Sequence, residues 1–175
     1  MNSQQAVVMD ESRVELVGEA PVAYGPRAAA RLIAYASECY FALPIHTTLE
    51  IIENPVVVTV PGAAYYTCGM LAWQGHYLPV IDICTLLRAY QDTPIISTPR
   101  YALVVAYQRA SGSPIEHGAL GLTVLPQTIE VGDEAWCELP ASSDLWPSLS
   151  LSCLRHNGAI APILDTAKLF MAYHG

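Results

Sequence analysis

The chain has 175 residues, a formal net charge of −8 and a hydrophobic share of 53%. The hydrophobic share excludes disorder of the main body, and only eight Lys and Arg residues argue against a nucleic-acid surface or attraction to anionic lipid. The cysteines show no CxxC spacing, the N-terminus has no signal-peptide pattern, and no apolar run reaches the roughly 18–20 residues that cross a bilayer. We therefore expect a cytoplasmic protein with reduced cysteines.

Residues 1–28 are expected to form an N-terminal arm, because glycine and proline residues there interrupt any hydrophobic pattern typical of a helix or strand. The ordered domain is expected over residues 29–175. Its first predicted element is a hairpin of two β-prone runs, 31–36 and 39–45. The segment 46–53 fits either a strand or a helical turn, and a further strand is expected at 55–60.

The stretch that organises the chain is GMLAWQGHYLPVIDICTLLRAY, at residues 69–90. It predicts a strand, a tight turn in which Gly75 supplies a positive φ, a second strand and a short helix. Pro79 indicates a strand start, an edge or a bulge. Asp82 stands where its carboxylate can accept hydrogen bonds from the first amides of the helix.

Short β-prone runs alternate with Pro-bounded or acidic segments in the second half of the chain. The predicted elements there are a polar connector at 91–99, a strand at 100–108, a hairpin loop at 110–117, strands at 118–125 and 128–131, an acidic surface excursion at 133–149, strands at 150–156 and 159–164, and a closing helix at 166–173.

Six residues of the 69–90 stretch recur near the C-terminus, in NGAIAPILDTAKLFMAY, at one constant offset. We infer two tandem copies of one β-rich unit, at about 31–92 and 99–174. We expect them to share a core, because an isolated unit of this size is only marginally stable. Many short strands separated by turns indicate an all-β barrel or sandwich fold. The identical pairs are Gly75 and Gly158, Pro79 and Pro162, Asp82 and Asp165, Leu86 and Leu169, Ala89 and Ala172, and Tyr90 and Tyr173.

The sequence offers no clear catalytic, metal or cofactor site. It lacks the common nucleotide-binding, serine-hydrolase and zinc-protease motifs. Asp82 and Asp165 are better explained as helix caps than as an acid–base pair, because they occupy matching places in the repeat. A small cysteine-dependent enzyme, with Cys84 and a distant histidine as its pair, stays open as a lesser alternative. The histidines, none at metal-ligand spacing, are His46, His76, His117, His156 and His174.

The order of motifs in the first copy resembles the CheW-like domain, the coupling module of bacterial chemosensory arrays. The motifs are YFALPI and LEII, then VTVPGA, then the QG pair and LPVIDI. The second copy carries the expected echoes in ALGLTV, TIEV and AIAPILD. The resemblance covers about residues 31–173.

This resemblance implies two intertwined five-stranded barrels of the Src-homology-3 type with short helices, no catalytic activity and no cofactor. It implies binding to the regulatory domain of a CheA-type histidine kinase and to the cytoplasmic tip of methyl-accepting receptors, within membrane-associated arrays. The pathway would be chemotaxis or twitching motility driven by type IV pili. The receptor-binding residues that it implies are Thr48, Leu49, Glu50 and Ile51, with Gln74 in the adjacent hairpin.

The chain departs from the family pattern at three places. Gln74 stands where the family usually has the arginine of Asn-Leu-Arg-Gly, and a neutral amide does not replace a fixed cation. Thr48 replaces an apolar residue, and Leu125 stands where an aspartate is common. These departures favour a specialised adaptor, such as one of a pilus-linked system. The alternative is an accessory or antagonist module that binds the kinase without docking receptors.

Overall fold

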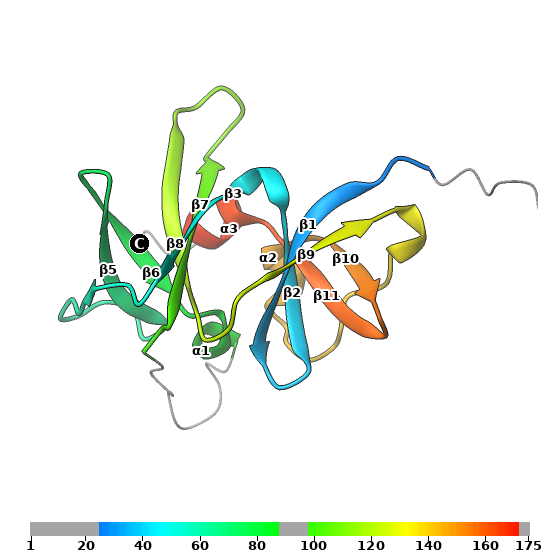
Figure 1. Ribbon diagram of the computed structural model, residues 1–175, viewed down its shortest axis with the longest axis horizontal. Helices are drawn as coiled ribbons and strands as arrows, with labels where there is room; N and C mark the ends of the chain where they lie inside the picture. The colour runs from blue at the N-terminus through cyan, green and yellow to red at the C-terminus, as the bar shows by residue number, and fades with distance from the viewer. Residues whose placement is uncertain (1–24, 88–97, 172–175) are drawn as a thin grey trace, which may run out of the picture.

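The computed structural model describes residues 25–87 and 98–171, which fold into two β-sheets and a few short helices (Figure 1). Each sheet forms one lobe, and the two lobes lie side by side. The helices are α1 (Ile83–Leu87), α2 (Trp146–Leu149) and α3 (Thr166–Met171), and 3₁₀ turns occur at Ile45–Thr47 and Asp133–Ala135.

The first lobe is a five-stranded sheet and the second is a six-stranded sheet. In sheet order, the first lobe contains β10 (Ser150–His156), β11 (Ala159–Leu164), β2 (Cys39–Pro44), β1 (Ala28–Ala36) and β9 (Gln127–Val131). The second lobe contains β3 (Thr48–Glu53), β7 (Tyr101–Gln108), β8 (Ile115–Leu122), β6 (His76–Ile81), β5 (Thr67–Trp73) and β4 (Val57–Val58).

Each lobe combines strands from both halves of the sequence. The hairpin β1–β2 joins the C-terminal strands through a parallel pairing that sets Ala42 opposite Ile163. The hairpin β7–β8 joins the first-half strands through an equivalent parallel pairing of Ala119 with Val80. The all-β fold and its intertwined lobes are thus as predicted, while the second lobe has six strands rather than five because the two-residue strand β4 adds an edge.

The central strands are buried on both faces because they border two cores at once. On β7, Ala102 and Val104 point into the interior of the second lobe, whereas Leu103 and Val105 point into a core between the lobes. Full burial of one large apolar side chain stabilises the fold by about 1.5–3 kcal/mol, so this central core dominates the packing. Its largest fully buried members come from both lobes and from the helices, and they include Phe41, Leu103, Leu120, Trp146, Leu169 and Phe170.

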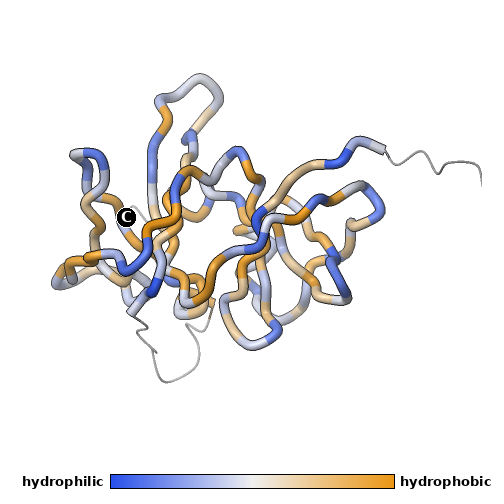
Figure 2. The backbone as a smooth tube through the Cα atoms, viewed as in Figure 1, coloured by the Kyte–Doolittle hydropathy of each residue, from blue (hydrophilic) through white to orange (hydrophobic). Residues whose placement is uncertain are grey.

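The two copies of the repeat close their hairpins with the same turn. The β5–β6 turn places Gln74 at φ 46° and Gly75 at φ 80°, and the β10–β11 turn places Asn157 at φ 48° and Gly158 at φ 83°. Two successive positive φ angles in a two-residue loop define the type I′ turn, which matches the twist of the strands that it joins. The positive φ expected at Gly75 is confirmed. Figure 2 shows hydrophilic residues at several hairpin tips and hydrophobic residues along the strands between them.

Both aspartates that follow these hairpins cap a helix, as predicted. Asp82 accepts hydrogen bonds from the backbone N–H of Cys84 (2.9 Å) and from the hydroxyl of Thr85 (2.8 Å). Asp165 accepts one from the N–H of Lys168 (3.1 Å). Capping satisfies amides that have no partner within the helix.

Three of the predicted elements differ in the structure. Strand β8 begins at Ile115, inside the segment predicted as a loop, and the predicted strand over 55–60 is reduced to Val57–Val58. The excursion over 133–149 is not confined to the surface, because Trp146 and Leu149 of α2 are buried in the central core. The predictions for residues 1–24, 91–97, Ala89, Tyr90, Ala172 and Tyr173 fall outside the described residues.

We predict that Trp146→Ala lowers the free energy of unfolding by about 3–5 kcal/mol, because it leaves a large cavity where α2 meets the central core. The matched control is Trp136→Ala, since the Trp136 side chain is 67% exposed and surface substitutions change stability by about 0.5 kcal/mol or less. Urea unfolding of both variants is the measurement. Similar losses in the two variants would contradict the packing of α2.

Candidate functional site

The segment that leads into β3 is shaped by two hydroxyl groups and a bulge. Thr47 and Thr48 donate hydrogen bonds of 2.8 Å to the carbonyl oxygens of Pro44 and Ile45, which close the 3₁₀ turn before the strand. The pairing of β3 with β7 shifts register between Thr48 and Glu50. Such a shift leaves one residue unpaired and redirects its side chain, and Leu49 is accordingly 49% exposed.

Glu50 connects β3 to a strand that is not its neighbour in the sheet. Its carboxylate accepts a hydrogen bond of 2.7 Å from the indole N–H of Trp73, at the end of β5. The Trp73 ring also packs against the ring of His117 on β8, with the ring centres 5.0 Å apart. These contacts connect β3, β5 and β8 through their side chains within the second lobe.

The predicted receptor-binding residues occupy different environments. Leu49 and Glu50 are exposed on β3, while Ile51 is half-buried and packs against the central core. Thr48 is half-buried in the 3₁₀ turn, so its hydroxyl has a local structural role. Gln74 is exposed at the tip of the β5–β6 hairpin, one residue beyond the indole that contacts Glu50.

Sequence reasoning did not identify Trp73 or His117 as members of this site. Trp73 directly precedes Gln74, in the stretch where the family usually has Asn-Leu-Arg-Gly. Its indole N–H is the donor that reaches Glu50, and His117 is the ring against which it packs. A tryptophan beside a tight turn was the one available signal, because Trp often combines an apolar contact with a hydrogen bond at the edge of a core.

Two grooves lie between the lobes, one beside the first turn of α3 and one beside the first turn of α1. The α3 groove, of about 380 Å³, is lined by the start of α3, the 3₁₀ turn at 45–47 and the ends of β7 and β8. The α1 groove, of about 230 Å³, is lined by the start of α1 and the ends of β1 and β8. Exposed apolar side chains flank the α3 groove at Ile115 (62% exposed) and Leu151 (59% exposed).

The grooves are equivalent by the internal repeat. Asp82 lines the α1 groove as Asp165 lines the α3 groove, and Tyr35 lines the first as Tyr107 lines the second. The parallel pairings make Ala119 the counterpart of Ala42. Gly121 and Thr123 in the α1 groove therefore correspond to Pro44 and His46 in the α3 groove. The duplication therefore gives the molecule two related inter-lobe grooves.

The two grooves are filled differently by phenylalanine. In the α1 groove, Phe41 of β2 lies 6.1 Å from Tyr35, measured between ring centres. Its counterpart on β8 is Gly118, and a side chain there would collide with the ring of Phe170 from α3. Phe170 instead stacks on Tyr107 at 5.1 Å and 10°. The glycine thus makes room for a ring that comes from the helix rather than from the strand.

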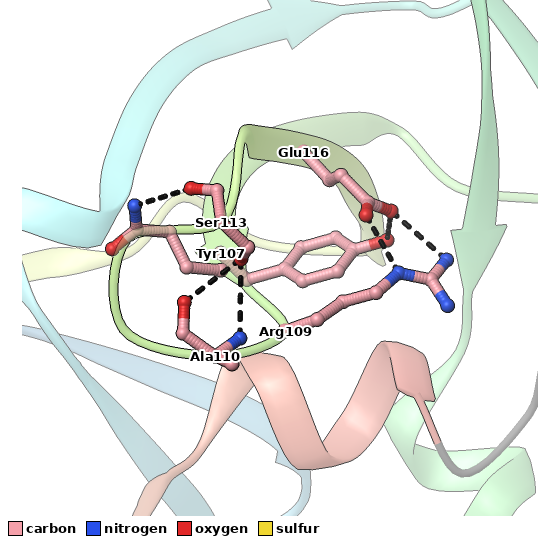
Figure 3. Close-up of polar contacts among 6 residues, drawn as sticks. Tyr107, Arg109, Ala110, Ser113 and Glu116 are labelled. Carbon is pink, nitrogen blue, oxygen red and sulfur yellow. Dashed lines mark hydrogen bonds and ion pairs between the residues drawn. The ribbon is translucent and has the colours of Figure 1, made fainter.

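A polar cluster covers the hairpin that rises beside the α3 groove (Figure 3). Glu116 forms an ion pair with Arg109, with contacts of 2.6 and 3.0 Å, and accepts a hydrogen bond of 3.1 Å from the hydroxyl of Tyr107. Burial and the Glu116 carboxylate together raise the pKa of Tyr107 to about 12. Ser113 completes the loop by hydrogen bonding to both backbone groups of Ala110.

The described residues contain no group of three or more His, Cys, Asp and Glu side chains that could hold a metal ion. Cys84 lines the α1 groove, and no histidine of the described residues lines it. Burial raises the pKa of Cys68 to about 11 and that of Cys153 to about 12. A nucleophilic cysteine requires the opposite direction, so neither thiol supports a cysteine-dependent enzyme. No helix in the described part of the chain is long and apolar enough to cross a membrane.

Comparison with known proteins identifies what this architecture is similar to. The CheW-like domain family matches residues 32–173. Among solved structures, the scaffolding protein TtCheW from Thermoanaerobacter tengcongensis superposes with a TM-score of 0.60 at 11% sequence identity, over 80% of this chain and 90% of that one. No curated protein is similar enough in sequence to count as a match. At such low identity the structural similarity concerns the fold alone.

We predict that Tyr107 makes stability fall at alkaline pH. An unfolded tyrosine loses its proton near pH 10, whereas folded Tyr107 keeps it up to about pH 12, so the folded state binds more protons in this window. Its contribution is fully present below about pH 10 and is lost as the pH rises toward about 12. The free energy of unfolding, measured with urea over this pH range, should decline less steeply for Tyr107→Phe than for the wild type. Tyr77→Phe, at a 72% exposed site, is the control, and an equal effect there would contradict the assignment.

Proposed function

Since this chain belongs to the CheW-like domain family, we propose that it is a non-catalytic adaptor that couples methyl-accepting receptors to a CheA-type histidine kinase. The proteins of this family are chemosensory scaffolds. The specific partners rest on the family resemblance and on the surface of the β3 segment. The mechanism would be reversible binding of two partners to one body, so that the state of the receptor biases the state of the kinase.

The observation that carries the receptor half of the proposal is the bulge at Leu49. It exposes an apolar side chain on an otherwise regular strand, in the segment that corresponds to the receptor-facing segment of the family. The preceding turn, with His46 and Thr47, lines the α3 groove, so strand and groove form one continuous surface. An amphipathic helical tip suits such a surface, since its apolar face would cover the exposed side chains of Leu49, Ile115 and Leu151.

The rigid relation between the lobes supports the coupling role. The central core draws on both lobes, and β7 is buried on both faces. A receptor bound near β3 and a kinase bound elsewhere would therefore hold a fixed mutual geometry. As a member of receptor arrays the protein would act in the cytoplasm.

The hydrogen bond between Glu50 and Trp73 supports an altered receptor specificity. The family usually has an arginine where this chain has Gln74, one residue beyond the indole that contacts Glu50. Here the indole N–H of Trp73 contacts the carboxylate and Gln74 is neutral. A receptor that relies on the missing cation would bind weakly. A specialised partner, such as a receptor of a pilus-linked system, fits this change, and an antagonist that binds kinase alone is the second candidate.

We predict that Glu50→Ala weakens binding to the cognate receptor fragment about tenfold, equivalent to about 1.4 kcal/mol, and leaves binding to the kinase regulatory domain unchanged. The variant removes the carboxylate and releases the Trp73 ring from β3. Glu53→Ala is the matched control, because Glu53 is an exposed glutamate on the same strand. Titration calorimetry against both partners is the measurement.

Three further outcomes decide between the candidates. Binding to the kinase domain alone, with no receptor binding by the wild type, would support the antagonist. Binding to neither partner would overturn the proposed function. Tighter binding of Gln74→Arg to receptors of other pathways would show that the missing cation sets specificity.

A further inference from the structure

Cys137, in the excursion over 133–149, and Cys153, on β10, lie directly opposite each other. The backbone N–H of Cys137 donates a hydrogen bond of 3.1 Å to the carbonyl of Cys153 on β10, beside the antiparallel bridge of Trp136 with Leu154. The two sulfur atoms are 3.4 Å apart, and both residues are buried. Opposed residues of an antiparallel pair are separated by about 5.5 Å between Cα atoms, a spacing that a disulfide spans without backbone movement.

We propose that Cys137 and Cys153 form an intramolecular disulfide when the protein meets hydrogen peroxide. The sulfur atoms must approach by only the difference between 3.4 Å and the bonded distance of about 2.05 Å, which small side-chain rotations supply. Neither residue belongs to the β3 surface or lines either inter-lobe groove. The site is therefore independent of the proposed receptor-binding surface.

The chemistry proceeds in two balanced steps. The Cys137 thiolate attacks one peroxide oxygen, the O–O bond breaks, and the sulfur becomes a sulfenic acid while hydroxide leaves and takes up a proton as water. The Cys153 sulfur then attacks the sulfenic sulfur, the S–S bond forms, and the second oxygen leaves as water with the Cys153 proton. Two thiols are oxidised by two electrons, and one peroxide is reduced to two waters.

The surroundings assign the order of the two steps. Cys137 lies on an irregular segment and is 9% exposed, whereas Cys153 lies within β10 and is 2% exposed. Burial, followed by the neighbouring Cys137 thiol, raises the pKa of Cys153 to about 12, so this thiol is a poor first nucleophile. Cys137 therefore meets the oxidant and Cys153 resolves the sulfenic acid. Because both are buried, the reaction is slow compared with that of an exposed catalytic thiol.

The disulfide would fix the excursion to β10. The residues between the two cysteines include α2, which places Trp146 and Leu149 in the central core. A covalent bond across this loop restricts the unfolded chain and stabilises the packed segment. Oxidation should thus raise the thermal unfolding temperature, and in this way oxidant exposure would strengthen the contact between the lobes.

Peptide mapping gives a direct test on the full chain, because trypsin separates the cysteines into two groups. The sequence has no Lys or Arg between residues 110 and 154, so Cys137 and Cys153 fall in the peptide 110–155. The other three cysteines fall in the peptide 32–88. The reduced protein is treated with hydrogen peroxide, unfolded, alkylated and digested. We expect the peptide 110–155 to be two hydrogens lighter and unalkylated, and the peptide 32–88 to carry three alkyl groups.

Two variants and one second readout complete the test. Cys137→Ala and Cys153→Ala should each abolish the lighter peptide and the rise in unfolding temperature, and Cys39→Ala should leave both intact. If either variant fails to fold, the test uses the wild type alone. Dithiothreitol should then reverse both the loss of two hydrogens from the peptide and the rise in unfolding temperature. Full alkylation of both cysteines after prolonged peroxide treatment would overturn the proposal, as would a disulfide confined to the peptide 32–88.

Discussion

The parallel pairings of β2 with β11 and of β6 with β8 determine how the two lobes are assembled. Through them each lobe takes a hairpin from the other half of the chain, so neither lobe closes from one copy of the repeat. The exchanged hairpins lie between the lobes, and this position buries β7 on both faces. The central core, the two inter-lobe grooves and the fixed mutual position of the lobes all follow from this exchange.

Local signals in the sequence predicted much of the fold. The strands Ser150–His156 and Ala159–Leu164, the positive φ of Gly75 and the capping by Asp82 and Asp165 agree with prediction, because turn chemistry and capping act within a few residues. The internal repeat indicated a duplicated unit. It did not show which strands pair in parallel, since such pairing joins residues far apart in the chain and leaves no local pattern.

The main error in the fold prediction has a similar cause. The excursion over 133–149 is acidic and broken by proline, which favours a surface position, yet its end buries Trp146 and Leu149. The pair of Cys137 and Cys153 was equally hidden, because it depends on how this excursion crosses β10. At the β3 site the segment was predicted from the family resemblance. The exposure of Leu49 depends on a bulge, and the contact of Glu50 with Trp73 depends on side chains of strands that are not neighbours in the sheet. Neither leaves a periodic pattern in the sequence.

The duplication also gave rise to two grooves that differ in their lining. Phe170 of α3, for which Gly118 leaves room, and Phe41 of β2 fill equivalent spaces with rings from different elements. The α3 groove retains exposed apolar flanks at Ile115 and Leu151 and continues into the bulged strand. In the proposed function, this asymmetric body holds a receptor and a kinase at the same time.

Simultaneous binding can be measured by sedimentation velocity of the protein mixed with both the kinase regulatory domain and the receptor fragment. The adaptor account predicts one species that contains all three components and sediments faster than either binary complex. A binary complex with the kinase domain that persists while added receptor stays unbound, or displacement of one partner by the other, would contradict it.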